Sequence, residues 1–252
     1  KLWRQTRKVS WDQVIDLRGS ATAHLLRARS RHVLGRQGRG LHRVLAYAEV
    51  LGLEASDPAP GFFLSPETQG TADRWLAGSG DILAMAPAAN WIGKTWPAER
   101  FAALAKALLG PEGPFPQGRL LLLGGREDAP AAAVVAQAVA PERVIHALGE
   151  PELLITYAML RRARLFVGND SGMMHLAAAA GAPTLGLFGP TDDTLYAPWG
   201  DHCAVVRASP FSVFKARDPQ LNLPEPHMVS LDEASVKAAA LALLARTEGV
   251  AP

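Results

Sequence analysis

From Asp81 onward, short uninterrupted apolar runs alternate with longer segments rich in Ala and Leu, and this alternation limits what the chain can fold into. A strand that is apolar on both faces is buried on both faces, as in a parallel sheet covered by crossover helices. Repeated strand–helix units with right-handed crossovers build a doubly wound sheet. We therefore expect a doubly wound parallel α/β domain with strands at Ile82–Ala86, Leu120–Leu123, Val144–His146, Leu165–Val167, Thr184–Phe188 and Ala204–Val206.

The segments between these strands have helical spacing. The segment Ala98–Leu109 has Pro97 before its first turn and Gly110 just past its end, and these residues commonly begin and end helices. After the last strand, the Pro-rich segment from Ala208 to Met228 predicts a long irregular loop. The expected helices are Ala98–Leu109, Pro130–Ala140, Pro151–Arg162, Gly172–Ala180 and Leu231–Ala245, the last with Ser230 as N-cap and Glu233 at the capping-box position.

The first part of the chain resembles the end of a second domain of the same kind. We expect a strand at Val14–Leu17, helices at Ala21–Arg29 and Leu41–Leu51, and a linker at Glu54–Gly61. Two strands alone do not make an independently stable sheet, so this part either leans on the next domain or belongs with strands before Lys1. The expected boundaries are residues 1–78, 79–230 and 231–252, the last being a terminal helix and tail.

Composition excludes several classes of protein. The chain has 252 residues, of which 48% are hydrophobic, and a formal net charge of +2, so it is not a disordered chain. No run approaches the roughly 18–20 apolar residues that a membrane helix needs. With Cys203 as the one cysteine, neither an internal disulfide framework nor a Cys-based zinc site is expected. The single cysteine agrees with a reducing compartment. The basic start Lys1–Lys8 is followed by a mixed segment and not by an apolar one, so we expect no secretory signal and a cytoplasmic location.

Positive charge is concentrated near the start of the chain. Residues 1–43 contain eleven Lys or Arg and two acidic residues, Asp12 and Asp16, which gives this segment a charge of +9. Such a segment either meets an anionic partner or is an ordinary solvated surface. The anionic partners that fit are a phosphorylated substrate, an anionic lipid surface and a nucleic acid.

The stretch G-N-D-S-G-M-M-H that follows the fourth expected strand carries the strongest chemical signal. Ligands of open α/β sheets bind at the carboxyl ends of strands, and the free N–H groups of a helix start attract phosphate. Gly172 allows close approach to the backbone, Ser171 can cap the helix and bind phosphate, and His175 lies one turn further on the same face. The alternative is that Asp170 or Ser171 only caps the helix and His175 packs in the core.

Two further loops open on the same edge of the sheet. In A-P-A-A-N-W-I-G-K-T-W-P, Lys94 either neutralises a phosphate or lies on the surface. Trp91 and Trp96 either stack on a ligand ring or anchor the loop by packing. In G-L-F-G-P-T-D-D, Thr191 and Asp192 offer a hydroxyl and a carboxylate to a polyol.

Together the three loops resemble glycosyltransferase family 9, the heptosyltransferases. The most specific element is D-S-G-x-x-H-L-A-A-A, and the resemblance extends to Val14–Arg18, Leu41–Leu53 and most of Ile82–Arg207. It implies the GT-B architecture of two Rossmann-like domains, with the N-terminal one incomplete here. It also implies transfer of a heptose from ADP-heptose to the lipopolysaccharide inner core with inversion and without a cofactor. The +9 segment would suit a phosphorylated, lipid-linked acceptor, so we also expect peripheral contact with the inner face of the cytoplasmic membrane.

The resemblance assigns roles residue by residue. Lys94 matches a lysine that contacts the donor phosphate, and Asn90 stands where the family often has Ser or Thr. Glu127, next to Asp128, stands where an acidic residue lies near the ribose. The matches to the donor-binding turn and to the following loop are Asp170, Ser171, Gly172, His175, Thr191 and Asp192.

The resemblance also implies what this sequence does not contain. The family opens with I-R-x-x-x-x-G-D, whose Asp is the general base, so we expect the base upstream of Lys1, and donor binding with little transfer from the chain alone. The metal-holding D-x-D pattern is missing because Asp192 and Asp193 are adjacent. We therefore expect Lys94, the helix start and His175 to stabilise the departing ADP without a metal.

Three other classes of protein are compatible with parts of this sequence. A nicotinamide-dependent oxidoreductase needs G-x-G-x-x-G after a strand, which neither Gly124-Gly125 nor the glycines of Gly35–Gly40 provide. A non-catalytic protein of GT-B ancestry that binds a nucleotide sugar or an anionic surface remains open, and turnover would distinguish it from an enzyme. Nucleic-acid binding is disfavoured, because the basic segment has few interleaved aromatic residues and no recognition motif.

Overall fold

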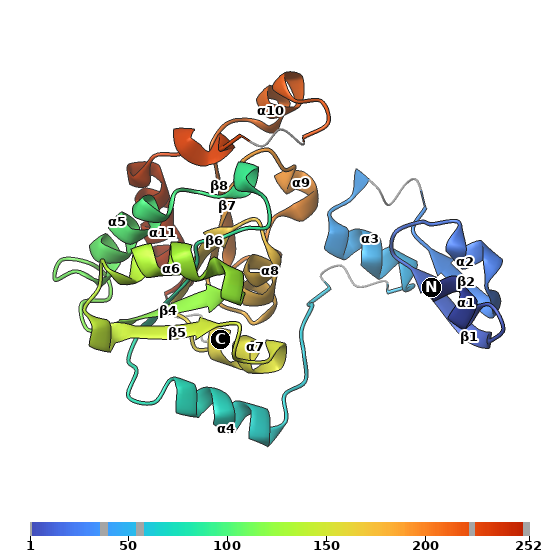
Figure 1. Ribbon diagram of the computed structural model, residues 1–252, viewed down its shortest axis with the longest axis horizontal. Helices are drawn as coiled ribbons and strands as arrows, with labels where there is room; N and C mark the ends of the chain where they lie inside the picture. Colours follow the sequence, from blue (N-terminus) through green and yellow to red (C-terminus); the bar gives the residue numbers. More distant parts are fainter. Residues whose placement is uncertain (1, 36–39, 54–57, 222–224, 249–252) are drawn as a thin grey trace. The chain divides into compact units, whose positions relative to one another are not determined.

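The computed structural model describes residues 2–35, 40–53, 58–221 and 225–248. Contacts divide the chain into two compact units (Figure 1). The smaller unit comprises Lys1–Pro60 with Thr194–Tyr196, and the larger unit comprises Gly61–Asp193 with Ala197–Pro252. Of the expected linker Glu54–Gly61, residues 54–57 lie outside the described residues.

The larger unit is built on one six-stranded sheet. Its order is β5-β4-β3-β6-β7-β8, and every neighbouring pair is parallel, which confirms the expected doubly wound sheet. The order reverses between β3 and β6, and this switch point is where open α/β sheets bind ligands. The strands are β3 Ile82–Ala86, β4 Arg119–Gly124, β5 Val144–Leu148, β6 Leu165–Asn169, β7 Thr184–Phe188 and β8 Cys203–Arg207.

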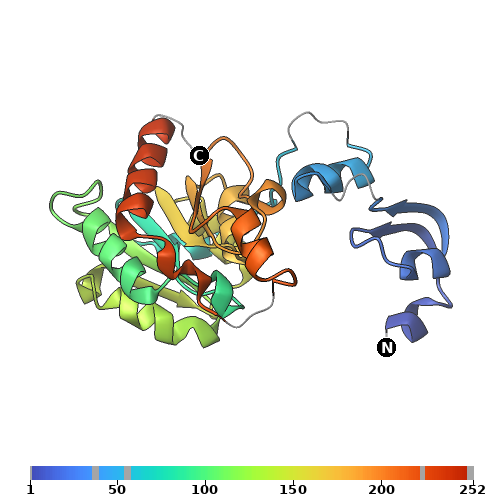
Figure 2. The ribbon, with the colours of Figure 1, turned by 90° about the horizontal axis from the view of Figure 1, so that it is seen from above.

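Helices cover both faces of this sheet (Figures 1 and 2). Successive residues of a strand point to opposite faces, so Leu83 and Met85 of β3 enter one core while Ile82 and Ala84 enter the other. The first core is closed by α5 (Ala98–Leu109), α6 (Ala129–Ala136) and α11 (Glu233–Thr247). The second is closed by α4 (Pro66–Trp75), α7 (Leu153–Leu160) and α8 (Gly172–Ala179). The continuous apolar strands are therefore explained by burial on both sides.

The predicted first residue of the last helix, Leu231, was wrong. Helix α11 begins at Glu233, and its N-cap is Asp232, whose carboxylate accepts a hydrogen bond from the Ser235 backbone N–H at 2.8 Å. Ser230 instead ends the short 3₁₀ turn η5 (His227–Ser230). The buried Leu231 lies between η5 and α11. Ser230 and Asp232 are both residue types that cap helices, and Asp232 is the one that begins α11.

The segment expected to be an irregular loop is partly helical. Helix α10 (Phe211–Arg217) begins after Pro210 and buries Phe214, and η5 follows before α11. Pro210 fits a helix start because no intrahelical N–H bond is needed there, and the buried Phe214 anchors the turn. The remaining short elements of the larger unit are η2 Ile92–Lys94, η3 Arg126–Asp128, η4 Pro141–Arg143 and α9 Asp193–Tyr196, the last shared with the smaller unit.

The smaller unit contains a two-stranded parallel sheet. Strand β1 (Ser10–Asp16) pairs with β2 (Arg27–Val33), from Ser10 opposite Arg27 to Asp16 opposite Val33. The expected helix at Ala21–Arg29 was wrong, because only α2 (Thr22–Leu25) is helical and the chain then enters β2. Pairing with β1 overrides local helix propensity here. The other helices of this unit are α1 Leu2–Thr6 and α3 Arg43–Val50, the latter within the range expected for a helix.

The Asp16 carboxylate holds the turn after β1. It accepts hydrogen bonds from the backbone N–H of Arg18 at 2.8 Å, and from the N–H and the hydroxyl of Ser20, both at 2.7 Å. The Ser20 hydroxyl lowers the pKa of Asp16 below its ordinary value, and the backbone hydrogen bonds lower it further.

Among the described residues, no helix has both the length and the apolar character needed to cross a bilayer.

Candidate functional site

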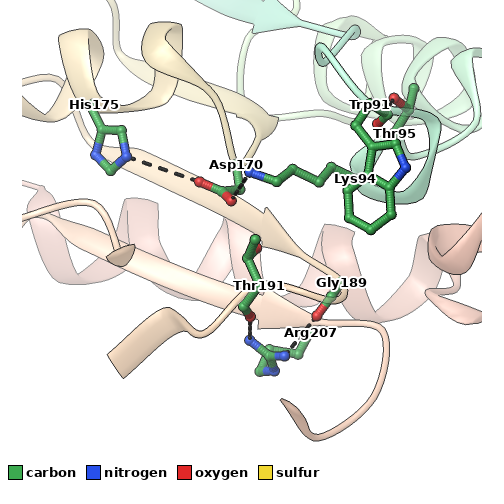
Figure 3. Close-up of polar contacts among 8 residues, drawn as sticks. All are labelled: Trp91, Lys94, Thr95, Asp170, His175, Gly189, Thr191 and Arg207. Atoms are coloured by element: carbon green, nitrogen blue, oxygen red, sulfur yellow. Dashed lines mark hydrogen bonds and ion pairs between the residues drawn. The ribbon is translucent and has the colours of Figure 1, made fainter. Parts of the chain in front are cut away.

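The switch point brings together three ionisable side chains from two loops that lie far apart in the sequence (Figure 3). Lys94, from the loop after β3, donates from Nζ to Asp170 Oδ2 at 2.7 Å. His175, from the first turns of α8, places Nε2 at 4.0 Å from Asp170 Oδ1. The Asp170 side chain is 7% exposed and that of Lys94 is 22% exposed, so the ion pair is largely shielded from water. An ammonium and an imidazole thus meet at one buried carboxylate.

A buried amide joins the two loops that supply these side chains. Asn169, at the end of β6, accepts a hydrogen bond from the Trp96 N–H at 3.0 Å and donates one to the Pro87 carbonyl at 3.1 Å. Because both ends of the Lys94 loop are tied to the residue before Asp170, the lysine is held beside the carboxylate. Our sequence reasoning did not assign Asn169 a role. The sequence feature that could have indicated a role for Asn169 is its amide side chain at the end of a strand that is otherwise apolar.

The tryptophans of the same loop anchor it by packing. Trp96 is fully buried, donates from its indole N–H to the Leu231 carbonyl at 2.8 Å, and packs edge-on against Phe101. Trp91 lies over Gly93, where an added Cβ would be 2.6 Å from the indole ring. A side chain at Gly93 would therefore force the Trp91 ring to move, and Lys94 follows directly.

The start of α8 completes the cluster. Ser171 is the N-cap residue, as the sequence predicts, but its hydroxyl makes no capping hydrogen bond. Its Oγ atom is buried and has no hydrogen-bond partner within the part of the chain that the structure describes. Gly172 faces open space, with no atom within 4 Å of an added Cβ. A half-buried serine with an unused hydroxyl thus lies beside free space at a helix N-terminus.

The third loop lies on the next strand of the same edge. Arg207, at the end of β8, donates to the carbonyls of Gly189 and Thr191, and the Thr191 side chain extends toward Asp170 (Figure 3). Thr191 Oγ1 is buried and, among the described residues, has no partner. Asp192 follows in the same loop and is half-buried. Our sequence reasoning did not single out Arg207.

Two of the expected site residues lie outside the cluster. Asn90 is exposed in the Lys94 loop, on the N-terminal side of Trp91. Glu127 is exposed in η3 after β4, and its carboxylate folds back toward Gly125, so it lies one strand away from the cluster. The structure thus gathers Lys94, Asp170, Ser171, Gly172 and His175 at the switch point, with the Thr191 loop beside them.

The charges of this edge suit an anionic ligand. A helix N-terminus carries roughly half a positive charge and presents N–H groups without intrahelical partners. Lys94 adds a cation beside it, and His175 adds a ring nitrogen.

Among residues 2–35, 40–53, 58–221 and 225–248, no three His, Cys, Asp or Glu side chains form a group able to hold a metal ion.

A parallel sheet of this order, with an anion-attracting edge at its switch point, defines a Rossmann-type domain of the class that binds nucleotides. Residues 24–222 match the model of glycosyltransferase family 9 (heptosyltransferase), and the chain belongs to this family. It is 30% identical over 148 residues to lipooligosaccharide heptosyltransferase 2 of Haemophilus influenzae, covering 56% of this chain and 41% of that protein. The chain therefore spans about two fifths of this curated relative.

Two solved structures share the fold. A family 9 glycosyl transferase from Veillonella parvula superposes with a TM-score of 0.74 at 24% identity, over 96% of this chain and 76% of that one. The E. coli ADP-heptose lps heptosyltransferase II gives a TM-score of 0.70 at 18% identity, over 98% of this chain and 81% of that one. This likeness confirms the expected GT-B fold class.

Proposed function

We propose that this chain carries the donor-binding domain of an inverting heptosyltransferase that uses ADP-heptose. The observation that carries the proposal is the convergence of Lys94, His175 and the start of α8 on one point at the switch of the sheet. A diphosphate is bound by cationic side chains and by helix N-termini, and this edge supplies the Lys94 ammonium and the start of α8, with the His175 ring beside them. Membership of family 9, and the E. coli relative named for ADP-heptose, support the choice of donor.

The charged and polar groups of the site have different roles in the reaction. The bond between the anomeric carbon and the phosphate oxygen breaks, and its electron pair stays on the diphosphate. Lys94 and the N–H groups at Gly172 stabilise that charge as it develops, and His175 binds the same group. Asp170 is itself an anion and would repel a diphosphate. We propose that it instead holds Lys94, 2.7 Å away, and orients the His175 ring.

In this proposal the nucleotide sugar lies across the carboxyl ends of the strands, with its ribose and its diphosphate near different strands. Glu127 follows β4 on one side of the switch point and would bind the ribose hydroxyls, with the diphosphate between β3 and β6. Asn90, in the Lys94 loop, would contact the same phosphates. The acceptor hydroxyl attacks the face of the sugar opposite the departing ADP, and its proton passes to a general base. The residues named here act on the side of the leaving group.

The acceptor that fits this family is the inner core of lipopolysaccharide or a related glycan. Residues 1–43 carry a charge of +9, which would attract a phosphorylated, lipid-linked acceptor. The same charge would favour peripheral contact with the anionic inner face of the cytoplasmic membrane. We propose a cytoplasmic location on this basis.

The test is a calorimetric titration of this chain with ADP-heptose, ADP, UDP and GDP. We expect ADP-heptose and ADP to bind and the other two nucleotides to bind at least tenfold more weakly. Lys94→Met should weaken ADP binding more than about tenfold, because it removes a charge-assisted bond to phosphate. Lys106→Met is the matched control, since Lys106 is an exposed lysine of α5 away from the cluster. Equal affinity for all nucleotides, or unchanged binding by Lys94→Met, would contradict the proposal.

A further inference from the structure

One arginine organises the whole loop after β7. Arg207 is the last residue of β8 and lies opposite Phe188, the last residue of β7, so its side chain reaches the residues that follow β7. Its guanidinium donates to the Gly189 carbonyl at 2.7 Å, to the Thr191 carbonyl at 2.9 Å and to Asp193 Oδ1 at 2.7 Å. It also donates to the Ser209 carbonyl at 3.1 Å. The side chain is 17% exposed, so these bonds are shielded from water.

This arrangement uses the planar, many-donor geometry that distinguishes arginine from lysine. Three acceptors that lie within five residues of one another are bound by two nitrogens of a single group. The backbone from Gly189 to Asp193 is therefore held in one conformation before any ligand arrives. Figure 3 shows the result: the Thr191 carbonyl faces Arg207, and the Thr191 side chain extends the other way, toward Asp170.

The Thr191 hydroxyl has an unmet hydrogen-bonding capacity. Its oxygen is buried and, among the residues that the structure describes, has no partner, although the residue as a whole is half-buried. A buried hydroxyl without a partner is costly. A ligand hydroxyl at this edge would supply the missing bond.

The strand order indicates which part of the donor meets this loop. With the diphosphate between β3 and β6 and the ribose near β4, the remaining end of the molecule points toward β7 and β8. We infer that Thr191 binds a hydroxyl of the transferred sugar and that Arg207 is the positioning residue that presents it. This inference rests on the proposed function, because it assumes a nucleotide-sugar donor in that orientation.

The experiment compares the affinities of Arg207→Gln for ADP-heptose and for ADP, each by calorimetric titration of the same chain. Arg143→Gln is the matched control, since Arg143 also donates to three carbonyls, those of Gly118, Leu109 and Phe115, at the opposite edge of the sheet. We expect Arg207→Gln to bind ADP-heptose about tenfold more weakly while ADP binding changes less than about twofold. Arg143→Gln should leave the ratio of the two affinities as in the unmodified chain.

Thr191→Val tests the hydroxyl with the arginine in place, and it remains informative if Arg207→Gln does not fold. Valine replaces the hydroxyl with a methyl group, so the expected result is a selective loss of about fivefold for ADP-heptose. Equal losses for both ligands in Arg207→Gln, or an unchanged affinity ratio in Thr191→Val, overturn the inference. If the unmodified chain binds neither ligand, the proposed function itself fails, and this outcome is distinct from a loss in the variants alone.

Discussion

Asn169→Leu should reveal how far the site depends on one buried amide. Asn169 is fully buried and is the partner of the Trp96 N–H and the Pro87 carbonyl. Leucine has a similar volume but no polar atoms, so both backbone groups would lose their hydrogen bonds in the interior. Each such group costs about 1–3 kcal/mol, and the added apolar contact returns about 1 kcal/mol. We expect a loss of about 3 kcal/mol in the free energy of unfolding.

Two measurements check this value. Urea titration gives the free energy of unfolding of the larger unit, and amide hydrogen exchange reports on the Trp96 N–H itself. A loss of about 3 kcal/mol corresponds to roughly hundredfold faster exchange at Trp96, since 1.4 kcal/mol is a factor of ten. Because the Lys94 loop is released at the same time, ADP binding should weaken as well.

Thr247→Val is the matched control for this experiment. Thr247 is also buried, and its hydroxyl donates to the Leu243 carbonyl at 2.9 Å within the last turn of α11. Its removal leaves no backbone N–H without a partner, so the expected loss is at most about 1 kcal/mol. If Asn169→Leu cost no more than this control and left Trp96 exchange unchanged, the amide would not be what holds the loop.

Two predictions concern titratable groups. The lowered pKa of Asp16 means that ionisation of its carboxyl stabilises the smaller unit above the ordinary value of 3.8, and that this stability is lost as pH falls through the lowered value. Urea titrations should therefore show that the unmodified chain has a larger free energy of unfolding than Asp16→Asn at about pH 6, and that the difference shrinks as pH falls below 3.8; a difference independent of pH would refute this. Burial raises the pKa of Cys203 to about 12, so alkylation by iodoacetamide at about pH 8 should be slow until urea unfolds the chain, and equal rates would contradict it.

Several features of the fold could be predicted because they depend on local pattern. The apolar runs of β3 and β7 were predicted with their observed limits, since strands buried on both faces need apolar side chains at every position. Helix α5 was also predicted from first to last residue, from Pro97 and Gly110 at its ends. The turn after β6 was predicted as a site because a strand end, a small-residue turn and a helix start are consecutive in the chain.

Other features could not be predicted, because they depend on partners that are remote in sequence. Arg27–Arg29 belongs to a strand only because β1 pairs with it. Ser230 and Asp232 are both suitable caps, but Ser230 ends η5 and the buried Leu231 follows it, so the helix begins after Asp232.

The sequence alone therefore determined the class of fold, the order of its elements and which loops carry the chemistry, because these follow from side-chain period and turn residues. Tertiary structure decided how those loops meet. Lys94 and Asp170 are 76 residues apart, and only the parallel pairing of β3 with β6 brings their loops together. Asn169 and Arg207 act through backbone groups of other loops. Such bonds leave no pattern in a single sequence, because every residue has a backbone carbonyl and every residue except proline has a backbone N–H.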